Sequence, residues 1–145
     1  MTKLALIRVR GARGLKPKIA KTLGLLRLNK PNHCVVVEDT NEMKGMINVV
    51  KDYITFGPVD EDTIIRLMSK RGTRGSKSLK DVASADEIKA AAKEMAGGKK
   101  PKEGFVNPVF RLTPPRKGYK SIKLPYPEGD LGARDEILPL LRRMM

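Results

Sequence analysis

Short apolar runs alternate with segments of helical periodicity in the N-terminal part of the chain. Residues 4–9, 34–37 and 53–56 are apolar and partly β-branched, and glycine, proline or asparagine bounds them, which predicts three strands. Gly57-Pro58 is expected to end the third strand. Between the runs, apolar residues recur three or four positions apart, which predicts two amphipathic helices. The order β-α-β-α-β favours an α+β or split-βαβ fold, with helices packed on a small sheet.

The two predicted helices have distinct start signals. Pro17 suits the first turn of the first helix, which is expected to fray near Gly24. The second helix is expected to have its cap at residues 39–40, and Asp39 stands three residues before Glu42, the spacing of a capping box. Gly45 inside this helix suggests close approach to a neighbouring element.

Beyond residue 58 the periodic signal is weaker, but three more helices are predicted, over residues 60–68, 84–97 and 135–143. Asp60 caps the first, and a capping box opens the second. Residues 71–78, rich in Gly, Ser and basic side chains, are expected to form a loop. We therefore divide the chain into a β-α-β-α-β core, residues 1–58, and a helical and extended C-terminal extension, residues 59–145.

A proline-rich segment lies within the extension. Residues 105–127 contain five prolines, which predicts an extended course along a surface. Residues 99–127 offer few apolar side chains for a core, so we expect them to be mobile in the free protein.

The positive charge of the chain is large and unevenly distributed. Its 145 residues include 30 Lys+Arg and 16 Asp+Glu, a formal net charge of +14. Residues 1–30 contain nine basic and no acidic residues, and residues 91–120 contain eight and two, whereas residues 31–60 contain two and five. Charge of this size attracts polyanions. Nucleic acid is the expected partner, and an anionic membrane surface is the second candidate.

A single cysteine and a single histidine limit the chemistry. One cysteine, Cys34, cannot form an internal disulfide, which favours a reduced, cytoplasmic setting, and with His33 it falls short of the about four ligands of a zinc site. Adjacent strand residues point to opposite faces, so His33 and Cys34 cannot act as a catalytic pair. We expect no catalytic residue, cofactor or metal. No apolar run reaches the roughly 18 residues of a membrane span, and no signal peptide is recognisable.

Two short segments share a pattern of arginine and glycine, at residues 10–14 and 71–75. Glycine lets the backbone approach a phosphate, and arginine offers forked donors to its oxygens. Lysines without acidic partners follow the first segment, and residues 111–120 form a basic stretch stiffened by proline. The candidate RNA contacts are Arg10, Gly11, Arg13, Gly14, Lys16, Lys18, Lys21, Arg27, Lys30, Arg71, Arg74, Lys77, Arg111, Arg116, Lys117 and Lys120.

Each of these features also has a simpler interpretation. Unrelated basic turns, a solvated helix face and a proline-rich linker would give the same patterns. With six aromatic residues, base stacking cannot be the main mode of binding, and no nucleotide-binding loop is present. Recognition of a folded polyanion through charge and shape remains. The alternatives are a free RNA- or DNA-binding protein and an RNA-processing enzyme.

Several blocks at fixed spacing resemble one family, the L-thirty proteins of the large ribosomal subunit. They are the strand at 4–9, the Gly/Arg loop, the run 23–30, Val37-Glu38-Asp39-Thr40 and Gly45-Met46-Ile47-Asn48. Phe110-Arg111-Leu112, residues 114–119, Gly132-Ala133-Arg134 and residues 141–144 resemble the extension of the archaeal members and of the eukaryotic counterpart, L-seven. The chain lacks the long basic N-terminal segment of the eukaryotic form and is similar to the archaeal type.

The resemblance implies a ferredoxin-like core, in which two helices back a three-stranded antiparallel sheet. It also implies a non-catalytic role in the large ribosomal subunit of the cytoplasm, where the protein binds rRNA and supports assembly and translation. The basic loop after the first strand and the first helix would face the RNA, close to 5S rRNA, with other ribosomal proteins as neighbours. Neither a membrane nor a small-molecule substrate is expected as a partner.

Overall fold

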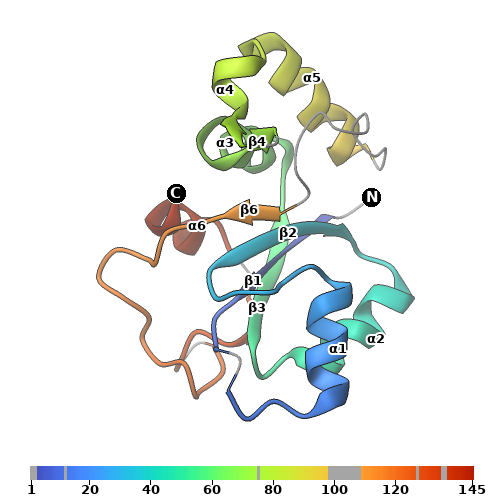
Figure 1. The fold of residues 1–145 in the computed structure, drawn as a ribbon, viewed down its shortest axis with the longest axis vertical. Coiled ribbons are helices and arrows are strands. Elements are labelled where there is room, and N and C mark those ends of the chain that lie inside the picture. The colour runs from blue at the N-terminus through green and yellow to red at the C-terminus, as the bar shows by residue number, and fades with distance from the viewer. Residues whose placement is uncertain (1–2, 12, 75, 98–108, 127, 135–136) are drawn as a thin grey trace.

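The computed structural model describes residues 3–11, 13–74, 76–97, 109–126, 128–134 and 137–145. Its N-terminal part confirms the predicted order of elements and the α+β class (Figure 1). The elements are β1 (Lys3–Arg8), α1 (Pro17–Leu25), β2 (His33–Glu38), α2 (Asn41–Val50) and β3 (Ile54–Val59).

The three core strands are the centre of a larger, mixed sheet with strand order β6-β2-β1-β3-β7. β1 lies between β2 and β3 and is antiparallel to both. Two short strands of the extension complete the sheet, β6 (Val109–Arg111) antiparallel to β2 and β7 (Gly132–Ala133) parallel to β3. The antiparallel three-stranded unit is therefore present, but the extension adds a strand to each edge. This pairing satisfies backbone groups that an open edge would expose.

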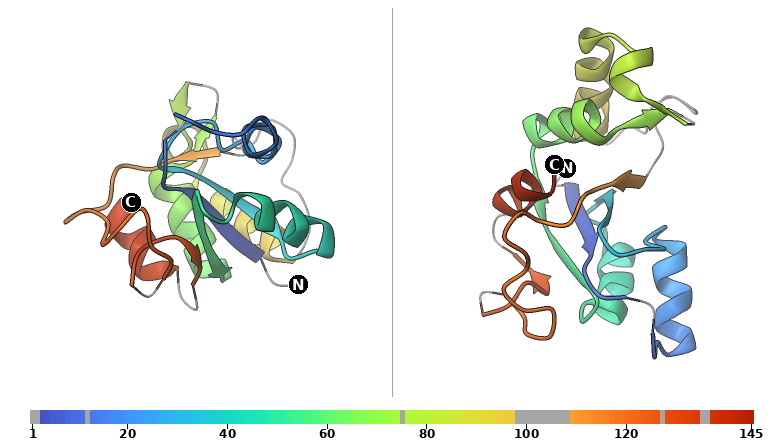
Figure 2. Two further views of the ribbon diagram at one scale, coloured as in Figure 1. Left: turned by 90° about the horizontal axis from the view of Figure 1, so that it is seen from below. Right: turned by 60° about the vertical axis from the view of Figure 1, so that its left-hand side comes forward.

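The sheet is buried on both faces, because successive side chains of β1 point to opposite sides. Leu4 and Leu6 belong to an apolar cluster with α1 and α2. Ala5 and Ile7 belong to a second cluster, with α3 (Glu61–Arg71) and α6 (Leu138–Met144). Figure 2 shows α1 and α2 on one side of the sheet and α6 on the other. Burial on both faces explains why residues 4–7 form a continuous apolar run instead of an alternating one.

The predicted caps of two extension helices are confirmed. The Asp60 carboxylate accepts hydrogen bonds from the Thr63 amide and hydroxyl at 2.9 and 2.6 Å, so α3 begins there. The Ser84 hydroxyl accepts one from the Glu87 amide at 3.3 Å and opens α5 (Ala85–Ala96). The prediction of a loop at residues 71–78 is wrong, because this segment contains a hairpin formed by β4 (Thr73–Arg74) and β5 (Lys77–Ser78). The single-turn helix α4 (Leu79–Val82) follows, too short to produce a periodic signal.

The predicted end of β3 is also wrong, because the strand continues through Gly57 and Pro58 to Val59. Proline is tolerated here because β7 pairs only with Thr55 and Phe56, so the outer edge of β3 is free at Pro58. Gly57 is needed for packing, since a β-carbon there would lie 3.1 Å from the carbonyl oxygen of Arg134.

The cap of α2 lies within the predicted residues 39–40, whereas the expectation for Gly45 differs from the structure. The cap is Thr40, whose hydroxyl accepts a hydrogen bond from the Met43 amide at 3.2 Å, and Asp39 pairs with Lys44 at 3.6 Å. No neighbouring atom of the described residues lies within 4 Å of a β-carbon built on Gly45. The close approach expected at this glycine is therefore absent.

The proline-rich segment is better anchored than expected. The predicted mobility falls partly on residues 99–108 and 127, which lie outside the described residues. In the remainder, Phe110 is 1% exposed and Leu112 8%, so two of the few apolar side chains of this segment belong to the core. No helix interrupts residues 112–126, as predicted, and α6 overlaps the range expected for the last helix and ends one residue beyond it, at Met144. The division of the chain at residue 58 stays a prediction.

Two glycines should respond to alanine in opposite directions. A β-carbon on Gly72 would lie 2.4 Å from the Met68 carbonyl oxygen, so Gly72→Ala should lower the free energy of unfolding by about 1–3 kcal/mol. Gly45→Ala fills open space within a helix and should raise it by about 0.5–1 kcal/mol. Urea denaturation of both variants measures these changes; equal stability of Gly72→Ala and the wild type would contradict the packing described.

Candidate nucleic-acid interface

Arg8, the last residue of β1, is a buried cation that links two basic segments. Its side chain is 3% exposed, and its Nε donates to the Arg10 carbonyl at 3.0 Å. Its Nη1 donates to the Leu28 carbonyl at 2.7 Å. Burial lowers the pKa of Arg8, but guanidinium stays charged in proteins. Arg8 thereby holds the loop after β1 and the turn after α1 against the sheet.

The loop from Arg10 to Lys16 exposes its polar groups. The Arg10 guanidinium lies 5.0 Å from the centre of the Tyr53 ring, and the Arg10 amide donates to the Tyr53 carbonyl at 3.2 Å. Gly11 and Gly14 are exposed, and Gly14 has φ +71°, which favours glycine. The exposed cations of this loop are Arg13 and Lys16.

Helix α1 presents a positive end to this loop. It begins at Pro17 with no side-chain cap and no acidic residue in its first turn, so its first amides have no side-chain acceptor. Lys18 and Lys21 are exposed on its surface. The loop and the helix together offer donors of the kind that bind phosphate oxygens.

α1 ends in a Schellman motif instead of fraying at Gly24. The Leu28 amide donates to the Leu23 carbonyl at 2.9 Å, and the Arg27 amide donates to the Gly24 carbonyl at 3.0 Å. Leu23 and Leu28 belong to the same apolar cluster. Arg27 therefore occupies the left-handed position that glycine usually takes, with φ 63°, and its side chain is exposed.

Asn32 joins the two basic parts of the chain. Its amide donates to the Arg8 carbonyl at 2.7 Å, and its own carbonyl accepts from the Leu112 amide at 3.2 Å. Its side-chain oxygen accepts from the Tyr119 hydroxyl at 2.7 Å. Burial, followed by the charge of Asp130, raises the pKa of Tyr119 to about 12, so this hydroxyl remains a donor. Lys30 precedes Asn32 by two residues and Lys117 precedes Tyr119 by two, so this bond brings both lysines to the same region.

A tight turn presents the cations of the proline-rich segment. The Gly118 amide donates to the Pro115 carbonyl at 3.0 Å, and Lys117 has φ 66°, again a left-handed conformation. Arg143 of α6 donates from Nε to the Arg116 carbonyl at 3.0 Å and from Nη2 to the Gly118 carbonyl. The side chains of Arg116, Lys117 and Lys120 are exposed.

Arg111 adds a further link between the N-terminal basic segment and the proline-rich basic segment. It pairs with His33 across β6 and β2, and its side chain is exposed. Burial lowers the pKa of His33, and the charges of Arg111, Lys30 and Arg8 lower it further. We call the set of cations joined in this way the basic band; it consists of Arg10, Arg13, Lys16, Lys18, Lys21, Arg27, Lys30, Arg111, Arg116, Lys117 and Lys120.

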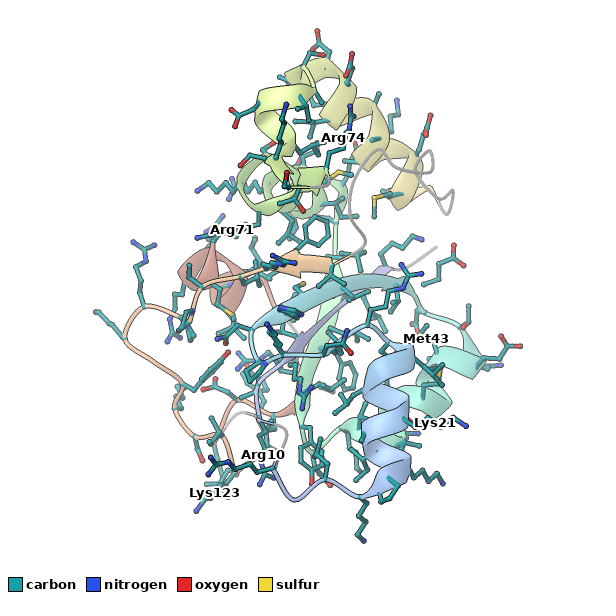
Figure 3. All side chains as sticks on the ribbon, in the orientation of Figure 1. Arg10, Lys21, Met43, Arg71, Arg74 and Lys123 are labelled. Atoms are coloured by element: carbon teal, nitrogen blue, oxygen red, sulfur yellow. The ribbon has the colours of Figure 1, made fainter. Side chains whose placement is uncertain are left out.

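Three predicted contacts do not join the basic band. Arg71 is partly buried, and its Nη2 donates to the carbonyl of Met145 at 3.0 Å, which fixes α3 to the C-terminal residue. Arg74 and Lys77 lie in the hairpin, and Figure 3 shows Arg74 at the opposite end of the long axis from Arg10 and Lys21. Gly72 is buried, unlike Gly11. The two Arg/Gly segments are therefore not equivalent.

Sequence reasoning missed the residues that position the band. Arg8 gives a detectable signal, because it is a charged residue inside a predicted buried strand. Asn32, Tyr119 and Arg143 give none, since their roles depend on contacts across the fold. The same is true of Arg134, which pairs with Asp130 and donates to Thr55 Oγ1 at 2.8 Å, attaching the extension to β3.

The only histidine and cysteine do not form a catalytic pair. Cys34 is fully buried among apolar residues, and burial raises its pKa to about 12. His33 is half-buried and outside that cluster. Among the described residues, no group of three His, Cys, Asp or Glu side chains is placed to hold a metal ion. In the same residues, no helix has the length and apolarity needed to cross a membrane.

Comparison with known proteins places the chain in a family. The family model described as Ribosomal protein L30p/L7e matches residues 4–54. The large ribosomal subunit protein uL30 of Methanococcus maripaludis is 43% identical over 151 residues, covering 97% of this chain and 98% of the relative. The uL30 proteins of Archaeoglobus fulgidus and Methanobrevibacter smithii are 41% and 44% identical, and each match covers at least 96% of both chains. The similarity thus includes the extension, and the chain belongs to the ribosomal protein L30p/L7e family, archaeal type.

Proposed function

We propose that this protein is a non-catalytic component of the large ribosomal subunit in the cytoplasm, where it binds rRNA through the basic band. The single observation that carries the proposal is the union of two basic segments, distant in sequence, at Asn32. The names of the relatives indicate the large ribosomal subunit, and the charge of the band indicates a polyanionic partner.

The electrostatics of the band supports this proposal. Ten of its eleven cations are exposed, and none forms an ion pair within the described residues. Unpaired like charges repel one another, whereas a phosphate backbone would neutralise them and release counterions.

Backbone strain at the band supports it further. The non-glycine residues with positive φ in the described part of the chain are Arg27, Asn32 and Lys117. Asparagine adopts this conformation readily, but arginine and lysine do not. Strain of this kind tends to persist where function requires the side chain.

The proposal also covers the position of the protein in the subunit and the three cations outside the band. We place the protein near 5S rRNA, beside other ribosomal proteins, on the family resemblance alone. We assign Arg71, Arg74 and Lys77 to a separate, minor RNA contact, since they lie outside the band.

Charge reversal should separate the band from the rest of the surface. A tagged Arg13→Glu/Lys16→Glu protein, expressed in an archaeal host, should be depleted from the large-subunit fraction of a sucrose gradient, because two exposed phosphate-binding cations become anions. The matched control Lys89→Glu/Lys93→Glu makes the same charge change on exposed residues of α5 and should incorporate like the wild type. A wild-type protein that stays at the top of the gradient would contradict the proposed function.

Arg27→Gly should increase stability and weaken RNA binding. Glycine relieves the left-handed strain at Arg27, which should raise the free energy of unfolding by about 1 kcal/mol and Tm by about 2–4 °C. Loss of the guanidinium should make the slope of log K against log salt for rRNA binding shallower by about 0.7–0.9, the range for one phosphate between a single strand and a B-form duplex. Rising stability with unchanged rRNA binding at every salt concentration would remove Arg27 from the interface.

A further inference from the structure

Three exposed apolar side chains gather in a short segment of the extension. In the described part of the chain, four large apolar side chains are exposed, and three of them, Ile122 (44%), Leu124 (48%) and Tyr126 (38%), lie within five residues. All five residues from 122 to 126 are exposed. Single apolar side chains on a surface need no explanation, but a contiguous group indicates a contact surface. We call these three residues the apolar tip.

Hydrogen bonds hold the backbone of the apolar tip in one conformation. The Tyr126 amide donates to the Leu131 carbonyl at 2.8 Å, and the Leu131 amide donates to the Leu124 carbonyl at 3.3 Å. The Ser121 hydroxyl accepts from the Leu124 amide at 3.3 Å, and the Ser121 carbonyl accepts from the Asp130 amide at 2.9 Å. The tip is therefore preorganised, which lowers the entropy cost of binding a partner.

Arg134 supports the ring of Tyr126 from one side. Its guanidinium lies 5.1 Å from the centre of the ring. The same guanidinium pairs with Asp130 and donates to Thr55 Oγ1 at 2.8 Å, and the Arg134 side chain is only 8% exposed. Because this nearly buried guanidinium covers one face of the ring, the exposed surface of Tyr126 lies on the other face and at the edges.

The surroundings of the apolar tip are positively charged. Residues 116–126 contain four cations and no acidic side chain, and all of these cations except Lys123 belong to the basic band. Figure 3 shows Lys123 at the same end of the long axis as Arg10 of the band. The tip thus continues a surface that carries unpaired positive charge. This charge favours RNA over a neighbouring protein as the partner of the tip.

The chemistry of the apolar tip fits a nucleobase better than a phosphate. The ring face of Tyr126 and the side chains of Ile122 and Leu124 offer no donor to phosphate oxygens. An aromatic face, by contrast, stacks on the face of any base. Bases that are unstacked in loops and bulges are the usual targets of aromatic side chains in RNA recognition.

We propose that Tyr126 stacks on one unpaired base of the rRNA, with Arg134 behind the ring and Ile122 and Leu124 beside the base. The inference rests on the proposed function and deepens it. The cations of the band bind phosphates without regard to sequence, whereas a stacked base requires an unpaired nucleotide at one position. The apolar tip thereby helps to fix the register of the protein on the RNA.

Two substitutions of Tyr126 separate stacking from simple apolar contact. Tyr126→Phe keeps the aromatic ring and should bind purified large-subunit rRNA like the wild type. Tyr126→Leu keeps apolar surface but removes the ring, and it should weaken binding about tenfold, the effect of losing one stacked base. Its slope of log K against log salt should equal that of the wild type, because no phosphate contact is lost.

A tryptophan reports the stack without relying on affinity. The chain contains no tryptophan, so Tyr126→Trp and the matched control Lys89→Trp, at an exposed position of α5, each introduce a single one. On addition of the same rRNA, stacking should quench the fluorescence of the tryptophan at position 126, whereas that of the control should not change. Because tryptophan keeps an aromatic ring over Arg134, this measurement serves if Tyr126→Leu fails to fold.

The outcomes separate this inference from the proposed function. Wild-type affinity of Tyr126→Leu, or an unquenched tryptophan at position 126 in a variant that binds rRNA, would overturn the stacked base and leave the proposed function intact. If Tyr126→Leu binds purified rRNA like the wild type but is depleted from the large-subunit fraction, the apolar tip contacts a neighbouring protein instead. Failure of the wild type itself to bind rRNA would contradict both.

Discussion

The fold of the region that carries the basic band depends on a buried guanidinium. Arg8 ends the central strand, and in the described part of the chain no carboxylate pairs with it. An unpaired buried charge is costly, so its bonds to the Arg10 and Leu28 carbonyls are strongly favoured. These bonds hold the first loop and the end of α1 at fixed positions on β1. The exposed cations are thus positioned from the interior of the protein.

Different parts of the protein determine its stability and carry its proposed binding surface. The sheet is covered on both faces by apolar clusters, and these supply the favourable free energy of folding. The surface works against folding, since the band collects unpaired cations and left-handed backbone at Arg27 and Lys117. Binding to a polyanion would relieve the repulsion. A protein of this kind is expected to gain stability on RNA, by mass action.

The sequence predicted the elements whose signals are local. The first strand and the caps at Asp60 and Ser84 were all recognisable from a few neighbouring residues, and the structure confirms them. The edge strands β6 and β7 were not predicted, because each has only two or three residues and forms through partners far along the chain. The interpretation of Gly45 failed for a related reason, since a glycine in sequence does not show what lies next to it.

The candidate interface likewise combines features with a local sequence signal and features that depend on contacts between distant residues. Positive blocks at residues 1–30 and 91–120 were evident from composition, but their union at Asn32 depends on hydrogen bonds to Leu112 and Tyr119, which are at least 80 positions away in the sequence. Arg71 illustrates the opposite case: its Arg/Gly context is like that of Arg10, but its side chain is partly buried, donates to the Met145 carbonyl and lies outside the basic band. A charge pattern can therefore predict the partner class, whereas only the fold shows which cations act together.

The central claim is that the two basic segments contact the same stretch of rRNA, and directed hydroxyl-radical cleavage tests it. The variants Lys30→Cys, Lys117→Cys and Lys93→Cys each remove one exposed positive charge and provide a site for an iron chelate, while native Cys34 is fully buried. The bond between Asn32 and Tyr119 brings positions 30 and 117 together, whereas position 93 lies in α5. The account predicts overlapping rRNA cleavage from positions 30 and 117 and none at those nucleotides from position 93. Separate cleavage sites for positions 30 and 117 would contradict it.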